Sequence, residues 1–257
     1  MQAAYRRERR ILGSCLAVVV ILSWLYLLTM ARDMSSMDMT GMTGMAMDNA
    51  PAMVLPELLS LYLMWIVMMV AMMLPSVTPM TLVFLSINQQ RQVSGRATVP
   101  TWLFIAGYLI TWACFALAAT MTQWALRATT LFSADMAIAN SALSAAILIG
   151  AGLYQLSSLK YKCLDLCRSP LSFLMSRWRE GHLGAVRMGI EHGVYCVGCC
   201  WLLMALLFVA GVMNLIWVFL ITVFVILEKL LPNGLYVSRL SGGILIGIGL
   251  MLGTGAF

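Results

Sequence analysis

Runs of about twenty apolar residues, separated by short polar segments, recur along most of this chain. A helix of about 20 apolar residues is long enough to cross the roughly 30 Å hydrocarbon core of a bilayer. The composition agrees, because 62% of the residues are hydrophobic and 10% are charged, whereas soluble domains carry about 25% charged residues. The sequence therefore predicts an all-α, polytopic transmembrane helix bundle that contacts the lipid bilayer.

About seven apolar segments are expected to cross the membrane. The first is longer than the apolar part of a cleaved signal peptide, so it is expected to remain as a helix. Pro75 and Pro79 fall inside the second segment and are expected to kink it. The segments cover residues 11–31, 58–87, 100–124, 141–159, 194–211, 214–231 and 242–257.

The basic residues predict the orientation of the bundle. Of the sixteen lysines and arginines, all but Arg32 and Arg127 fall in the N-terminus or in loops on the same side. Cytoplasmic loops are enriched in Lys and Arg, so we expect a multi-pass protein of the cell inner membrane, with the N-terminus in and the C-terminus out. The chain then divides into a basic N-terminus with the first helix (1–31), an external methionine-rich loop (32–56) and a six-helix membrane domain (57–257) with a cytoplasmic loop at 160–191.

The external loop contains a short tandem repeat, in which the spacing M-x-x-M-x-M occurs twice. Thioethers are neutral, soft ligands that favour Cu(I), and they form no disulfides in an oxidising compartment. We expect this loop to capture copper or silver, with a low-complexity linker as the alternative. The candidate ligands are Met34, Met37, Met39, Met42, Met45 and Met47.

Methionines continue along the second apolar segment. Met64, Met68 and Met72 are four residues apart and share one face of a helix. Such a stripe usually serves as adaptable packing. Because this one begins near the external loop and runs inward to the two prolines, a stepwise path for Cu(I) is the second interpretation.

Cysteine replaces methionine on the cytoplasmic side. The C-x-x-C spacing binds Cu(I) or Zn(II), or acts as a redox couple. Cys163 and Cys167 are four residues apart and share a face if this stretch is helical. His192 and Cys196 have the same spacing. The candidate metal ligands are Cys163, Cys167, His192, Cys196, Cys199 and Cys200.

Charges at the membrane edge are costly, so each of them is expected to have a partner or a function. Glu228 and Lys229 are expected to form an interfacial pair at the inner end of the sixth helix. Glu191, which adjoins His192 and the cysteines, is expected to form the functional pair with that histidine. The last helix carries G-x-x-x-G spacings, at 243–247 and 249–253, that predict close packing against another helix.

Several of these segments resemble one bacterial family of integral membrane proteins of unknown function, described as predicted metal-binding, with some members labelled copper chaperones. The resemblance spans about residues 55–250 and implies metal handling without an established mechanism. Its most specific part is the Cys-Val-Gly-Cys-Cys-Trp segment. The segments that carry it are 64–76, 151–155, 162–163, 167–170, 193–201 and 203–204.

These patterns together predict a non-enzymatic membrane protein that binds Cu(I) and aids its transport or delivery, as a chaperone or transporter. The expected partners are the bilayer, the metal ion and a copper chaperone or copper-dependent membrane enzyme, but no nucleic acid. One alternative is a membrane thiol–disulfide oxidoreductase that uses Cys196, Cys199 and Cys200, although the expected external loops contain no cysteine. A structural or assembly subunit of a respiratory complex is another. The sequence contains no P-loop, so an ATP-driven pump is not expected.

Overall fold

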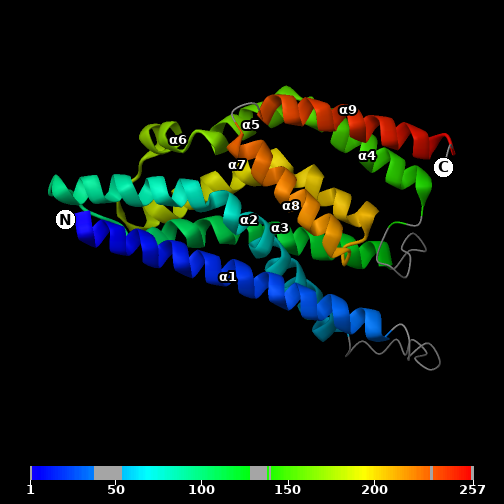
Figure 1. The fold of residues 1–257 in the computed structure, drawn as a ribbon, viewed down its shortest axis with the longest axis horizontal. Coiled ribbons are helices and arrows are strands. Elements are labelled where there is room, and N and C mark those ends of the chain that lie inside the picture. Colours follow the sequence, from blue (N-terminus) through cyan, green and yellow to red (C-terminus); the bar gives the residue numbers. More distant parts are fainter. Residues whose placement is uncertain (1, 38–53, 128–137, 139, 232–233, 256–257) are drawn as a thin grey trace.

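The computed structural model describes residues 2–37, 54–127, 138, 140–231 and 234–255, and nine α-helices account for nearly all of them (Figure 1). The all-α class is confirmed. The helices are α1 (Gln2–Met37), α2 (Val54–Val93), α3 (Thr101–Arg127), α4 (Ser141–Gln155), α5 (Ser158–Arg168), α6 (Pro170–Arg177), α7 (Gly181–Ala210), α8 (Leu215–Leu230) and α9 (Gly234–Gly253).

The number of helices suited to cross a membrane is lower than the seven expected. By length and composition α1, α2, α3, α7 and α9 qualify, and the bent pair of α4 and α5 adds a sixth if it counts as one span. The sixteen residues of α8 make a helix about 24 Å long, which is shorter than the roughly 30 Å of hydrocarbon. The sequence count was too high because apolar runs continue past the helix ends into turns.

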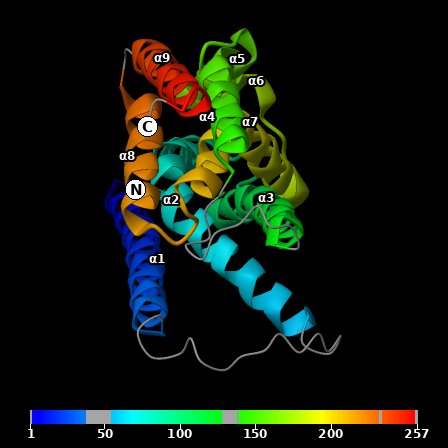
Figure 2. The same cartoon turned by 90° about the vertical axis from the view of Figure 1, so that its right-hand side faces the viewer.

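Successive long helices alternate in direction. Figure 1 shows α1, α3, α7 and α9 running one way along the long axis and α2, α4 and α8 running the other way. The N-terminal and C-terminal ends therefore lie at opposite ends of the bundle. Figure 2 shows α4 beside α9 and shows α1 at the edge of the bundle, where most of its residues are exposed.

The segment expected to be a cytoplasmic loop at 160–191 is helical almost throughout. It contains most of α5, all of α6 and the first turns of α7, which begins at Gly181 and not at residue 194. The short helix α6 turns Phe173 and Leu174 into the core, while Leu171 and Met175 stay exposed. The buried side of α6 therefore packs against the protein.

A serine separates α4 from α5. The backbone of Ser157 is extended, and its hydroxyl accepts a hydrogen bond from the N–H of Lys160 at 3.2 Å, so it acts as the N-cap of a new helix. The two helices meet at a bend of 62°. The fourth apolar segment was expected to run straight to residue 159, and the cap ends it at Gln155 instead.

Glycines set the closest helix approaches. A Cβ atom built on Gly107 of α3 would lie 2.1 Å from the carbonyl oxygen of Val186, and one on Gly189 of α7 would lie 2.1 Å from that of Phe104. In α9, Gly249 meets α4 in the same way, whereas Gly243 and Gly247 have no atom within 4 Å of a built Cβ. One expected G-x-x-x-G pair of α9 therefore does not face another helix of the described chain.

Candidate metal site

Three of the predicted cysteines lie on consecutive turns of α7 and are buried. The Sγ atoms of Cys199 and Cys200 donate to the carbonyl oxygen of Cys196, at 3.1 and 3.0 Å. Short hydroxyl and thiol side chains commonly bond back to the preceding turn of a helix in this way. The three residues form no disulfide in this structure, and their spacing gathers them on one side of α7.

Cys196 is held by residues from three other helices. Its Sγ atom lies 3.0 Å from the Nζ of Lys229 on α8 and 3.1 Å from the hydroxyl of Tyr108 on α3. Lys229 also donates to the hydroxyl of Ser76 on α2 at 3.1 Å, and Tyr108 to the carbonyl oxygen of Met73 at 3.3 Å. The sulfur of Cys196 thus has a cation and a hydroxyl within hydrogen-bond distance.

Sequence reasoning missed Lys229, Tyr108 and Ser76 as members of this site. The expected pairing of Glu228 with Lys229 is wrong, because Glu228 binds Lys160 at 2.6 Å while Lys229 faces Cys196. Ser76 stands between the two prolines of α2, so the methionine stripe does end beside the cysteines. That position was the one signal in the sequence that could have indicated this residue.

His192 lies one turn before Cys196 on the same face of α7, as the spacing predicted. Its ring packs among Phe104, Phe173 and Tyr108, with centroid distances of 6.0, 5.5 and 5.9 Å. Its Nδ1 atom is buried and has no hydrogen-bond partner. A buried polar atom without a partner is costly, so this nitrogen is available for a ligand.

Glu191 does not join the histidine. Its carboxylate forms ion pairs with Arg177, Arg179 and Arg187 at N–O distances of 3.3 to 3.4 Å. These charges cover the first turns of α7, and the apolar part of the helix follows from residue 194. Cys196 therefore lies near the boundary between the charged and the apolar parts of α7. The expected functional pair of Glu191 with His192 is wrong, because the two side chains have different surroundings.

The cysteines of α5 come to the same place. This stretch is helical, so Cys163 and Cys167 share a face, and that face meets α7. A Cβ built on Gly198 of α7 would lie 3.0 Å from the Sγ of Cys163. Cys167, one turn further along α5, is partly buried and packs against the same core. Five cysteines from two helices thus gather in one region, called the cysteine cluster below.

The predicted methionine ligands fall into three groups. Met64, Met68 and Met72 are buried in α2, at 2%, 1% and 0% exposure, as part of the core. Met34 and Met37 belong to the last turns of α1. The remaining loop residues lie outside the described part of the chain: Met39, Met42, Met45 and Met47.

The donors of the cysteine cluster are not arranged as a closed metal cage. Within the described residues, no three His, Cys, Asp or Glu side chains are grouped so that they could hold a metal ion together. Structural zinc sites need four such ligands in a tetrahedron. Cu(I) prefers soft sulfur ligands and is stable with as few as two of them. Two soft thiol ligands are thus enough for Cu(I), whereas a structural zinc site needs more.

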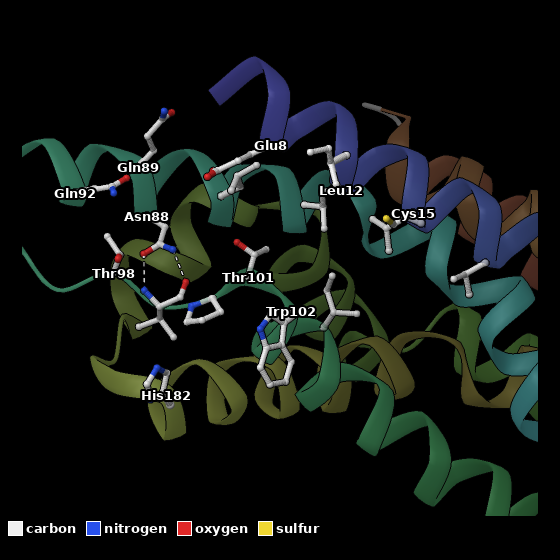
Figure 3. Close-up of a pocket in the computed structure, with 17 residues that line it drawn as sticks. Glu8, Leu12, Cys15, Asn88, Gln89, Gln92, Thr98, Thr101, Trp102 and His182 are labelled. Atoms are coloured by element: carbon white, nitrogen blue, oxygen red, sulfur yellow. Dashed lines mark hydrogen bonds between the residues drawn. The ribbon is translucent and has the colours of Figure 1, made fainter. Parts of the chain in front are cut away.

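A groove of about 750 Å³ lies elsewhere, between α1, α2 and the start of α3 (Figure 3). Asn88 closes one wall, because its side chain exchanges two hydrogen bonds with the backbone of Val99. Cys15, Trp102 and His182 also line it. The groove contains none of the residues predicted to bind metal.

Comparison with protein families gave one match, to the PpoB2 family described as copper chaperone, over residues 62–252. Comparisons with curated proteins and with solved structures gave no match. The matched part runs from within α2 to the end of α9 and includes the whole cysteine cluster, but not the external methionines. Since it covers well over half of the sequence, this chain belongs to the PpoB2 copper chaperone family.

Proposed function

We propose that this protein is a multi-pass protein of the inner membrane that binds Cu(I) at the cysteine cluster and delivers it to a partner. The external methionine loop captures the ion, and the buried methionines of α2 lead it inward. The recipient is a second copper chaperone or a copper-dependent membrane enzyme. The family assignment supports the copper chemistry, and the apolar helices support the membrane location.

The observation that carries the proposal is the convergence of thiols from two helices. Cys163 of α5 lies against Gly198 of α7, Cys199 and Cys200 bond to the carbonyl oxygen of Cys196, and His192 offers a buried nitrogen without a partner one turn away. Thiols that lie this close together and stay reduced provide the soft ligands that Cu(I) prefers. A site with few ligands also releases its metal more readily than a closed cage, as delivery requires.

The test is Cu(I) binding by the purified full-length protein in detergent, in competition with a coloured Cu(I) chelator. Cys196→Ser and Cys199→Ser should each weaken binding, because a hydroxyl is a poor ligand for a soft ion. Cys15→Ser and Cys114→Ser are matched controls, since both cysteines are exposed on other helices. Equal Cu(I) binding by the cluster variants and the controls would overturn the proposal.

A further inference from the structure

Lys229 places a positive charge against the central thiol of the cysteine cluster. Its Nζ lies 3.0 Å from the Sγ of Cys196 and 3.1 Å from the Oγ of Ser76. The nearest carboxylate in sequence, Glu228, is already paired with Lys160 at 2.6 Å. Lys229 therefore faces the sulfur of Cys196 and not the carboxylate of its own helix.

Charge balance matters at this site because the surroundings are apolar. Cysteine must lose its proton to bind a metal ion, and an uncompensated charge inside a protein or membrane is costly. Two thiolates around a monovalent ion leave one negative charge, which the ammonium of Lys229 neutralises. Two thiolates around a divalent ion are already neutral, and Lys229 then adds an uncompensated positive charge.

Resting on the proposed function, we infer that Lys229 is the residue that sets the metal preference of the cysteine cluster. It makes the cluster accept a soft monovalent cation, Cu(I) or Ag(I), between two thiolates, and it disfavours Zn(II) and Cd(II). A third thiolate would reverse this preference, because it would make a divalent complex neutral beside the lysine. The inference applies to a metal ion held by two thiols of the cluster, one of which is Cys196, the thiol that Lys229 contacts.

The test compares metal preference across variants of the full-length protein in detergent. Lys229→Met keeps the length of the side chain and removes the charge, so it should lower the affinity for Cu(I) relative to that for Zn(II) by about ten- to a hundredfold. Lys229→Arg keeps the charge and should retain most of the preference. Lys162→Met is the matched control, because Lys162 is exposed on α5, and it should behave as the unaltered protein.

A second variant tests the same idea with the lysine in place. Ser76→Asp sets a carboxylate beside Nζ, so it should neutralise the ammonium and shift the preference in the same direction as Lys229→Met. Ser76→Asn has the same shape without the charge and should shift it far less. Elution volume and thermal unfolding show which variants are folded. If Lys229→Met does not fold, Ser76→Asp tests the role of the lysine charge in its place.

The two proposals fail in different ways. If the unaltered protein and Cys196→Ser bind Cu(I) equally well, the copper site itself is wrong. If the unaltered protein binds Cu(I) at these thiols but a folded Lys229→Met or Ser76→Asp variant keeps the same ratio of Cu(I) to Zn(II) affinity, the role of Lys229 is overturned. A lower ratio in these variants, with Lys229→Arg and Ser76→Asn close to the unaltered protein, supports it.

Discussion

The carboxylate of Glu228 pairs with the ammonium of Lys160, 68 positions earlier in the chain, at 2.6 Å. Both side chains are fully buried. Lys160 also donates to the side-chain oxygen of Gln155, which in turn interacts with the hydroxyl of Ser238 at 3.2 Å. The pair therefore joins α8 to the bend between α4 and α5 and to α9.

Removing one member of this pair should destabilise the fold. Lys160→Met leaves the carboxylate of Glu228 buried without a cation, and such a loss costs about 3–5 kcal/mol. The double variant Lys160→Met, Glu228→Leu removes both charges and should regain most of that stability. Unfolding in detergent measures the effect, with Lys162→Met as the control on the exposed face of α5. A double variant no more stable than the single one would contradict this account.

The contact between α3 and α7 should be sensitive to a single methyl group. Gly189→Ala places a Cβ 2.1 Å from the carbonyl oxygen of Phe104, so the helices must separate, at a cost of about 1–3 kcal/mol. Gly243→Ala of α9 is the control, because nothing lies within 4 Å of its Cβ, and alanine favours a helix. The temperature of thermal unfolding should fall for Gly189→Ala and should stay the same or rise for Gly243→Ala. Equal stability of the two variants would argue against the close crossing.

The orientation of the protein stays a prediction from the uneven distribution of Lys and Arg. A reporter that is active only outside the cytoplasm should work when fused after Asp48 or after the C-terminus. It should fail when fused after Gln92 or Glu180, because both positions lie on the side rich in basic residues. The two termini lie at opposite ends of the bundle, as this arrangement requires (Figure 1). Activity of the reporter at Glu180 would be inconsistent with it.

Features within a single segment were predictable from the sequence. The apolar runs indicated α2 and α3, because the length of a run decides whether it can cross a bilayer. The spacing of Cys163 and Cys167 indicated a shared face, and the cap at Ser157 makes that stretch helical. In each case the physical cause lies in residues that are close in the chain.

Features that depend on tertiary packing were not predictable. Adjacent residues of a helix point about 100° apart, so Glu228 and Lys229 meet different helices and cannot pair as their adjacency suggested. Tyr108 carries no motif, and it reaches Cys196 only because the glycines of α3 and α7 bring the two helices together. The sequence showed the donors of the site but not the residues that hold them.

Residues 38–53 of the predicted methionine-rich loop lie outside the described residues, so the role of the loop stays a prediction from the M-x-x-M-x-M repeat. A peptide of residues 32–50 should bind Cu(I) in competition with a chelator, and Zn(II) should not displace it, because thioethers bind hard or borderline ions poorly. Replacing its six methionines by leucine keeps the apolar bulk and removes the sulfur. If this variant binds Cu(I) as well as the original peptide, the loop is only a linker.

The redox state of the cluster separates copper binding from thiol–disulfide exchange. An oxidoreductase needs a C-x-x-C pair that cycles between dithiol and disulfide, whereas a metal site needs both thiols reduced. In the structure Cys196 and Cys199 are free, and the thiol of Cys199 bonds to the carbonyl oxygen of Cys196. We therefore expect both residues to be reduced in growing cells.

Thiol trapping in intact membranes should show this directly. Cys196 and Cys199 should be found as thiols, and added Cu(I) should protect them from alkylation because the metal occupies the sulfur atoms. A substantial disulfide between Cys196 and Cys199 that does not respond to the copper supply would favour the oxidoreductase, because a metal ligand and a cycling disulfide cannot use the same sulfur atoms at once.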